Sequence, residues 1–412
     1  MIRKTDCIIL GGGAAGLAAC AYLATRGLEV IVVERLDRVG KKIMAAGNGR
    51  CNLSNAEMSA SMYGEAASFV KSVYKETPPE EVLSFFSSLG LMTAQEEGRI
   101  YPRTMMAASV LDVLRAACAG SNVHMLTNTQ AVSLSPSRRG GWSVQLQSGE
   151  GLFAPHVLCA MGGSASPHLG TDGAGTAMLS QLGHCITPLY PALVQLKCDH
   201  AALRSLKGIR VQAALSLLID SQIAAQETGE LLFADYGVSG VCVFQLSRYA
   251  VRALGKHKDV RLHVNLLPEV PVSETFSWLQ SRIAQSRNSD AQSLFTGVFP
   301  RLLALAILKE ASVEPGAAAH SLTVQQQRAL AQAICAFPLP VTGTQGMKNA
   351  QVTAGGVALE DIDPQSMASH LYSGLYVAGE TLDVDGPCGG YNLHFAFASA
   401  LTAAKAIAGQ AG

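Results

Sequence analysis

A glycine-rich turn near the N-terminus constrains the fold of this chain more than any other feature. An apolar run at residues 6–10 precedes the turn, an Ala- and Leu-rich stretch at residues 17–26 follows it, and a second apolar run covers residues 28–33. These patterns predict strand, turn, helix, turn and strand. The turn fits the motif GxGxxG, formed by Gly11, Gly13 and Gly16 with Ala14 and Ala15 between the last two glycines. The region is therefore expected to form a Rossmann-type unit that binds a dinucleotide.

An acidic residue ends the second predicted strand. Glu34 stands 23 residues after Gly11 and is followed by Arg35, which we count with the same site. A carboxylate at this position can bind the ribose hydroxyls and disfavours a 2′-phosphate. The cofactor is expected to be a dinucleotide without that phosphate, but this unit alone does not decide between FAD and NAD.

A second loop with unusual composition follows the acidic residue. Its core, AGNGRCNLSN at residues 46–55, is rich in Gly, Asn and Ser. Such a segment fits neither a helix nor an ordinary strand, and its backbone donors suit a long cofactor that runs through it. The residues of this region that we expect to contact the cofactor are Lys41, Lys42, Gly47, Asn48, Gly49, Arg50, Cys51 and Asn52.

The same loop carries a family resemblance. It reads as K-x-x-x-x-G-x-G-R-C-N-x-[ST]-N, and the chain also contains GELLFADYGVSG, VTAGGV and GLYVAGETLDVDGPCGGYN. Together these motifs resemble the bacterial HI0933-like flavoproteins, also labelled BaiN-like or aminoacetone oxidase-like. The resemblance implies FAD as cofactor. It also implies an α/β fold: a two-part Rossmann-type FAD-binding domain with an inserted β-barrel-like domain and a nested helical domain.

The C-terminal motif has its own physical logic. A strand predicted at residues 374–378 would deliver Gly379 and Glu380 beside the ribityl and phosphate part of the flavin. The last helix then opens at Gly389, Gly390, Tyr391 and Asn392. Amides at that helix start can face the pyrimidine end of the flavin ring and stabilise negative charge on the reduced ring. The alternative interpretation of these glycines is a helix cap or a linker that binds no ligand. We also assign Gly162 and Gly163 to the cofactor site.

Element patterns divide the chain into three parts. The FAD-binding domain is expected at residues 1–188 and 342–412, a β-rich inserted domain at 189–268 with about 336–341, and a helical inserted domain at 269–335. Within these parts helices are predicted at residues 65–89, 275–287, 299–311 and 323–334, and strands at 123–133, 192–196, 213–219 and 260–266.

Three residues near the last helix are candidates for chemistry. Cys388 would have a lowered thiol pKa if the helix N-terminus pointed at it, and its thiol could donate a proton to a double bond. A passive thiol is the competing interpretation. His394 could act as an acid or base, although a lone histidine is more often structural. Tyr391 could donate to the substrate or pack on the flavin ring.

The favoured function is that of an FAD-dependent oxidoreductase. Hydride would pass between a reduced donor such as NAD(P)H and an unsaturated or amine-type substrate. A second GxGxxG motif is lacking, so NAD(P)H would bind only transiently, on another surface. Names in the family point to amine oxidation, bile-acid-type reduction and uridine reduction in ribosomal RNA by dihydrouridine synthases. An alternative from another class is a non-catalytic FAD-binding redox sensor.

The RNA alternative has modest support from local charge. Between Lys197 and Arg261 there are nine Lys and Arg residues against six acids. A solvated protein face explains this excess about as well. Whether the substrate is a small molecule or RNA therefore stays open at this point.

Composition limits the other partners. Lys and Arg equal Asp and Glu at 31 each, so no global field attracts nucleic acid or membranes. The ten cysteines show neither CxxC pairs nor zinc spacing, so no metal is expected. The most apolar internal run, residues 302–308, is far shorter than the roughly 20 residues that cross a bilayer. Without a recognisable secretory signal, a cytoplasmic protein is expected. The oligomeric state is left open.

Overall fold

The computed structural model describes residues 2–138, 140–286 and 289–411, and it divides into two compact units. The first unit contains the residues up to Tyr190 and those from Val352 onward, whereas the second is Pro191–Gln351. Each unit has its own apolar core.

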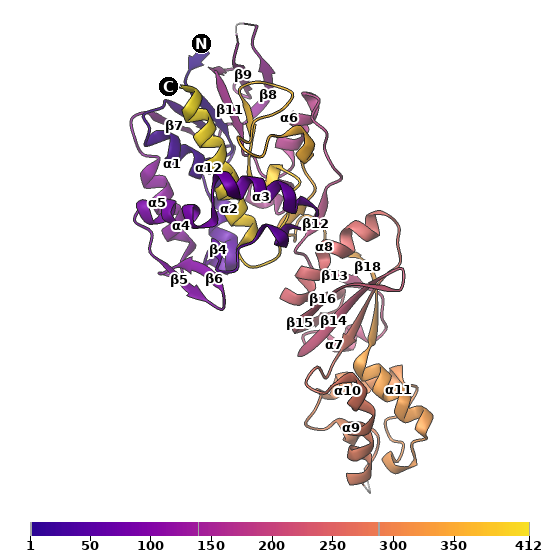
Figure 1. The fold of residues 1–412 in the computed structure, drawn as a ribbon. Coiled ribbons are helices and arrows are strands. Elements are labelled where there is room, and N and C mark those ends of the chain that lie inside the picture. Colours follow the sequence, from indigo (N-terminus) through magenta and orange to yellow (C-terminus); the bar gives the residue numbers. More distant parts are fainter. Residues whose placement is uncertain (1, 139, 287–288, 412) are drawn as a thin grey trace. The chain divides into compact units, whose positions relative to one another are not determined.

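A five-stranded parallel sheet forms the centre of the first unit (Figure 1). Apart from Cys7, strands β2 and β3 consist of Val, Ile and Leu, and every residue in them is buried, as expected for a sheet covered on both faces. The strand order is β20-β11-β2-β3-β7, with bounds β2 Cys7–Leu10, β3 Val30–Val33, β7 Val123–Leu126, β11 His156–Cys159 and β20 Leu375–Val377. The last strand comes from the C-terminal part of the chain, which completes the sheet.

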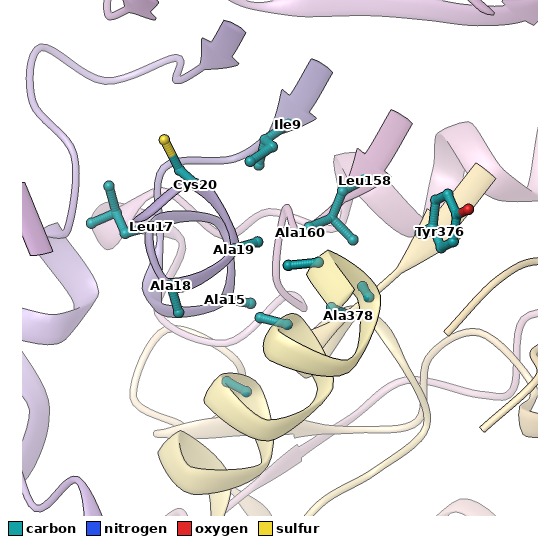
Figure 2. Packing of buried hydrophobic residues seen from close by; sticks show 14 of the residues in the cluster. Ile9, Ala15, Leu17, Ala18, Ala19, Cys20, Leu158, Ala160, Tyr376 and Ala378 are labelled. Atoms are coloured by element: carbon teal, nitrogen blue, oxygen red, sulfur yellow. The ribbon is translucent and has the colours of Figure 1, made fainter. Parts of the chain in front are cut away.

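Two alanine-rich helices pack together beside this sheet. They are α1, Ala14–Ala24, and α12, Tyr391–Ala411, from opposite ends of the chain. Figure 2 shows Ala15 and Ala19 on the side of α1 that faces the yellow α12, whereas Leu17 and Cys20 point away. Small side chains let the two helix axes approach closely, so the start of α12 lies in the same unit as the GxGxxG turn.

Smaller elements surround this core. A four-stranded sheet has the order β1-β10-β9-β8, and a three-stranded sheet has the order β4-β6-β5. The bounds are β1 Ile2–Lys4, β4 Ser54–Asn55, β5 Thr93–Glu96, β6 Arg99–Pro102, β8 Ala131–Pro136, β9 Trp142–Leu146 and β10 Gly151–Ala154. The remaining helices are α2 Lys41–Ala45, α3 Ala67–Glu76, α4 Pro79–Ser88, α5 Ala107–Ala117 and α6 Ala174–Gln181.

The second unit contains a closed six-stranded barrel of order β13-β16-β15-β14-β17-β18. Its strands are β13 Leu196–Cys198, β14 Arg210–Ile219, β15 Gln222–Ala234, β16 Gly237–Ser239, β17 Val260–Asn265 and β18 Phe337–Thr344. Its helices are α7 Leu203–Leu206, α8 Val241–Gly255, α9 Val272–Gln285, α10 Arg301–Glu310 and α11 Val324–Cys335. The last three lie between β17 and β18 in the sequence. The predicted α/β fold with an inserted barrel and a nested helical segment is confirmed.

Three local predictions were wrong. The single helix expected at residues 65–89 is broken into α3 and α4, because Pro78 and Pro79 cannot continue a helix. The strand expected at 192–196 falls between β12, Tyr190–Ala192, and β13, where Leu193 has a left-handed backbone with φ 49°. The strand expected at 123–133 is interrupted at Asn128, whose φ is 51°. The long helix α8 inside the barrel segment was not predicted.

Candidate cofactor and active site

The GxGxxG turn lies between β2 and α1 and has the backbone that a phosphate site needs. Gly11 has φ 102°, and an added Cβ there would lie 2.5 Å from the carbonyl oxygen of Ala160. A Cβ at Gly16 would lie 1.9 Å from the carbonyl oxygen of Gly11. Both positions therefore require glycine. At Gly13 an added Cβ would meet nothing within 4 Å, so the side of the turn beside the α1 N-terminus is open. Ala14 and Ala15 supply the first amides of α1.

Glu34 braces this turn. Its Oε2 accepts a hydrogen bond from the Gly12 amide at 2.9 Å, and its Oε1 accepts one from the Leu36 amide at 2.8 Å. A carboxylate oxygen can accept more than one hydrogen bond, so both oxygens keep acceptor capacity for ribose hydroxyls. The carboxylate is held beside the turn, as a ribose-binding acid requires.

The basic residues after Glu34 are held by acids. Arg35 forms a salt bridge with Asp172. Lys41 Nζ lies 2.5 Å from Asp37 Oδ1, and this hydrogen bond lowers the pKa of that carboxyl below its usual value. Both Arg35 and Lys41 were predicted to contact the cofactor, and in the structure each side chain is paired with an acidic residue of the protein.

Lys42 joins three distant segments. Its Nζ lies 2.7 Å from Glu380 Oε2, while Glu380 Oε1 accepts from the backbone amide of Thr353 at 2.8 Å. The Thr353 hydroxyl in turn accepts from the Ser164 and Ala165 amides at 2.7 and 2.9 Å. Sequence reasoning missed Thr353, although it lies within the VTAGGV motif.

Glycine is required where this network is tightest. A Cβ at Gly163 would lie 2.3 Å from Thr353 Oγ1. Gly162, with φ 75°, donates its amide to Thr381 Oγ1 at 3.1 Å. Gly379, with φ 70°, donates its amide to Ser399 Oγ of α12 at 3.0 Å. The structure therefore brings the predicted glycines of the 162–163 and 379–380 segments to one place.

The loop at residues 46–55 has a strongly bent backbone. Gly47, Asn48, Gly49 and Cys51 all have positive φ, from 55° to 83°. Gly47, Asn48 and Gly49 are exposed. Cys51 is fully buried, and burial raises the pKa of its thiol to about 12. Its thiol is therefore protonated and unreactive.

Arg50 turns away from this bend toward the β5–β6 hairpin. Its Nη1 lies 2.9 Å from Glu96 Oε2, and its guanidinium lies 4.7 Å from the centre of the Tyr101 ring. Both contacts hold the loop in place. The structure thus gives Arg50 a bracing contact with the hairpin.

The start of α12 is bound to the same loop. Asn55 Nδ2 donates to the Gly389 carbonyl at 2.9 Å. Asn392 closes the preceding turn, because its side chain bonds the amide and the carbonyl of Gly386 at 2.8 and 2.9 Å. A Cβ at Gly390 would lie 2.3 Å from the Ser54 carbonyl oxygen. Loop and helix start are therefore one structural unit, and Asn55 was not predicted from the sequence.

The three candidate chemical residues differ in their surroundings. Cys388 is half-buried, and burial raises the pKa of its thiol, an effect that Arg99 partly offsets. The lowering expected for a thiol that faces the helix N-terminus is not found, because desolvation by burial outweighs the nearby cation. Tyr391 is buried against Tyr63, with ring centres 6.3 Å apart, and burial also raises the pKa of its hydroxyl.

His394 lies one turn into α12 and is fully buried. Its Nδ1 is 2.9 Å from Ser54 Oγ, and burial lowers the pKa of the imidazole to about 3. The ring is therefore neutral at physiological pH. A neutral ring bonded to the loop is better suited to fixing α12 against that loop than to moving protons.

These features fit a bound dinucleotide. The open side at Gly13 leaves room for a pyrophosphate at a helix N-terminus, and Glu34 is held beside the turn, where a ribose-binding acid is expected. Farther along, the carboxamide oxygen of Asn52 is buried and lacks a hydrogen-bond partner among the described residues. That observation indicates a missing polar ligand beside the α12 start.

The described residues contain no group of three or more His, Cys, Asp or Glu that could hold a metal ion. No helix in the described ranges is long and apolar enough to cross a membrane.

Known proteins are similar to this chain along most of its length. The sequence model of the HI0933-like protein Rossmann domain matches residues 5–406. A 3-dehydro-bile acid delta(4,6)-reductase from Clostridium scindens is 38% identical over 404 residues, which is 97% of this chain and 98% of that protein. A ribosomal RNA dihydrouridine synthase from Escherichia coli is 27% identical over 98% of both chains.

Solved structures support the fold. A 3-ketosteroid delta1-dehydrogenase from Sterolibacterium denitrificans is similar with a TM-score of 0.52 and 14% identity, covering 99% of this chain and 100% of that one. The quinol fumarate reductase of E. coli gives a TM-score of 0.51 at 15% identity, over 100% of this chain and 72% of that one. The chain belongs to the HI0933-like family and is an FAD-dependent oxidoreductase.

Proposed function

We propose that this enzyme reduces a carbon–carbon double bond conjugated to a ketone in a steroid-type molecule of the bile acid class. The observation that carries this proposal is the 38% identity to the 3-dehydro-bile acid delta(4,6)-reductase along almost the full length of both chains. The name of that relative describes double bonds at positions 4 and 6 next to an oxidised position 3, which is a conjugated ketone.

The chemistry of such a substrate defines what the site must do. Hydride adds to the carbon distant from the carbonyl, negative charge moves to the carbonyl oxygen, and a proton then reaches the carbon next to the carbonyl. Two electrons and two hydrogens thus convert the double bond to a single bond. When bound, reduced FAD supplies the hydride, and NAD(P)H is the donor that we propose for its reduction. The protein must hold the ring, bind the carbonyl and supply the proton.

Cys388 is the proton donor that we propose. It lies three residues before the start of α12, and burial raises the pKa of its thiol, so the thiol carries its proton at neutral pH. A general acid must be protonated before it reacts. The half-buried position leaves part of the side chain accessible to a substrate.

Arg99 of β6 is the residue that we propose to bind the carbonyl oxygen of the substrate. It is half-buried and acts electrostatically on Cys388. Glu96 lies opposite Arg99 in the β5–β6 pairing but forms its salt bridge with Arg50 instead. No carboxylate of the described residues forms a salt bridge with Arg99. This positive charge is therefore available for the oxygen on which negative charge develops.

The charge distribution favours a small molecule over RNA. Of the nine basic residues between Lys197 and Arg261, four form salt bridges with neighbouring acids: Lys207, Arg210, Lys258 and Arg261. Arg248 is also buried. An RNA-binding face needs basic side chains that reach phosphates, and five of these nine residues are paired with an acid or buried.

The test compares the two substrate classes directly. Purified holoenzyme with NADH or NADPH, without oxygen, is given either a 3-oxo bile acid with double bonds at positions 4 and 6 or ribosomal RNA from a strain lacking dihydrouridine in that RNA. Mass spectrometry then detects the gain of two hydrogens. We expect the gain in the bile acid. A gain confined to the RNA would instead identify a dihydrouridine synthase and refute the proposal.

A further inference from the structure

The carboxamide oxygen of Asn52 is a buried acceptor in the cofactor region that finds no partner in the part of the chain that the structure describes. Its Oδ1 is completely buried, yet no hydrogen-bond donor among the described residues reaches it. Buried polar atoms in folded proteins nearly always have a partner, so an orphaned acceptor indicates a donor on a ligand. The required donor is an N–H or O–H group that arrives with the ligand.

The backbone around Asn52 fixes the direction of this acceptor. On one side Cys51 has a left-handed backbone with φ 57°, and a Cβ at Gly47 would lie 2.9 Å from the Asn52 amide nitrogen. On the other side the Leu53 amide donates to the Ile100 carbonyl at 2.9 Å. Asn52 therefore sits in a tightly held turn, and its side chain is placed by the fold.

The acceptor lies directly beside the start of α12. A Cβ added at Gly390 would lie 2.8 Å from Asn52 Oδ1. The first helical hydrogen bond of α12 is donated by His394 to the Gly390 carbonyl at 3.0 Å. The preceding amides, including those of Tyr391 and Asn392, belong to the positive end of a helix 21 residues long. An orphaned acceptor thus stands next to a group of backbone donors.

This pair of features matches one edge of the flavin. The pyrimidine end of the isoalloxazine ring presents the sequence C=O, N3–H, C=O, in which a donor lies between two acceptors. The ring takes up negative charge near one of those carbonyls when it is reduced, which suits the helix start. The N3–H between the carbonyls suits an acceptor such as Asn52 Oδ1.

We infer that Asn52 is the residue that binds the imide edge of the flavin, its Oδ1 accepting a hydrogen bond from N3–H. This contact holds the ring against the start of α12. The inference concerns the cofactor and is independent of which substrate the enzyme reduces. A failure of the bile acid proposal therefore leaves it untouched.

The test uses FAD and 3-methyl-FAD, which cannot donate from N3, and measures both dissociation constants with apoprotein by flavin fluorescence. Wild-type protein is expected to bind FAD at least about tenfold more tightly than 3-methyl-FAD. This difference in dissociation constant corresponds to the loss of one hydrogen bond of ordinary strength. Asn52→Leu keeps the bulk of the side chain and removes the acceptor. In this variant the two dissociation constants should become equal within about twofold.

Controls separate the hydrogen bond from other effects. Asn48→Leu, in the exposed part of the same loop, should keep the wild-type ratio. Asn52→Asp keeps an acceptor and should also keep a preference for FAD. If Asn52→Leu retains the wild-type ratio, the methyl group is rejected by steric contact alone and the inference is wrong.

A second measurement does not depend on any variant. In wild-type holoenzyme reconstituted with FAD labelled with ¹⁵N at N3, the N3–H proton should give a slowly exchanging correlation signal. Loss of that signal to rapid exchange with water would show an N3–H that faces solvent and would overturn the assignment to Asn52.

Discussion

Lys42 Nζ lies 2.7 Å from Glu380 Oε2, although 338 residues separate them in the sequence. Both side chains are mostly buried, with exposed fractions of 26% and 19%. The bond joins the segment after β3 to the segment after β20, so it holds together the two parts of the chain that form the cofactor domain.

Removing the charge of Glu380 should destabilise the first unit. Glu380→Gln keeps the acceptor for the Thr353 amide but leaves Lys42 partly buried without its partner. We expect a loss of about 1–2 kcal/mol in the free energy of unfolding, measured by urea denaturation of the apoprotein. Lys41→Met is the matched control: Lys41 pairs with exposed Asp37 one turn away, and we expect a clearly smaller loss of stability. Equal losses in both variants would contradict the role of the long-range pair.

Two glycines of the GxGxxG turn should respond differently to alanine. Gly16→Ala should destabilise the fold by about 1–3 kcal/mol, because its Cβ would collide with the Gly11 carbonyl. Gly13→Ala has space within the protein and should unfold like wild type. Its methyl group would occupy the open side of the turn, so the dissociation constant for FAD should rise about tenfold or more. Unchanged FAD affinity in Gly13→Ala would argue that the pyrophosphate lies elsewhere.

His394 should make stability depend on pH. Its pKa is about 3 in the folded chain and about 6.5 when exposed, so the unfolded state alone takes up a proton between these values. The stabilising contribution of the neutral ring is fully present above pH 6.5 and is lost as the pH falls toward 3. Relative to His394→Gln, wild type should lose about 2 kcal/mol between pH 7.5 and pH 5.

Urea unfolding of both proteins at pH 7.5 and pH 5.0 checks this. The buried residues His156 and His184 are present in both proteins and cancel in the comparison. If the difference between wild type and His394→Gln is the same at both pH values, the imidazole is not held neutral by burial.

Cys388→Ala should slow only the step that uses a proton. Reduction of the flavin by NAD(P)H should stay within about twofold of wild type, whereas reoxidation by substrate should slow by about 100-fold, the usual contribution of a general acid. Stopped-flow absorbance separates the two steps. Cys185→Ala, at an exposed cysteine, is the control. Equal reoxidation rates in Cys388→Ala and wild type would assign the proton to another group.

The features that the sequence predicted well are local ones. The strand, glycine turn, helix and acid of the first unit follow one another directly, so spacing alone identifies them. The helices α9, α10 and α11 were also predicted within a few residues, because their segments are rich in Gln, Ala and Leu and carry few strand signals.

Features that depend on distant contacts were not predictable. Nothing near Thr353 in the sequence shows that its hydroxyl accepts two amides from the 164–165 segment. The raised pKa of Cys388 could not be derived from its position before a helix, because burial depends on how the loop packs. Likewise Asn52 was chosen by motif, whereas its orphaned acceptor and its closeness to Gly390 are visible only in three dimensions.

The central claim is that the bound flavin passes hydride to a conjugated ketone. The most direct test is a single-turnover experiment in which FAD in the enzyme is reduced without oxygen by one equivalent of NADH or NADPH and then mixed with a 3-oxo bile acid with double bonds at positions 4 and 6. We expect the oxidised flavin absorbance to return fully, with one equivalent of product that is two hydrogens heavier. Flavin that stays reduced beside unchanged bile acid, in protein that binds FAD stoichiometrically, would contradict the account.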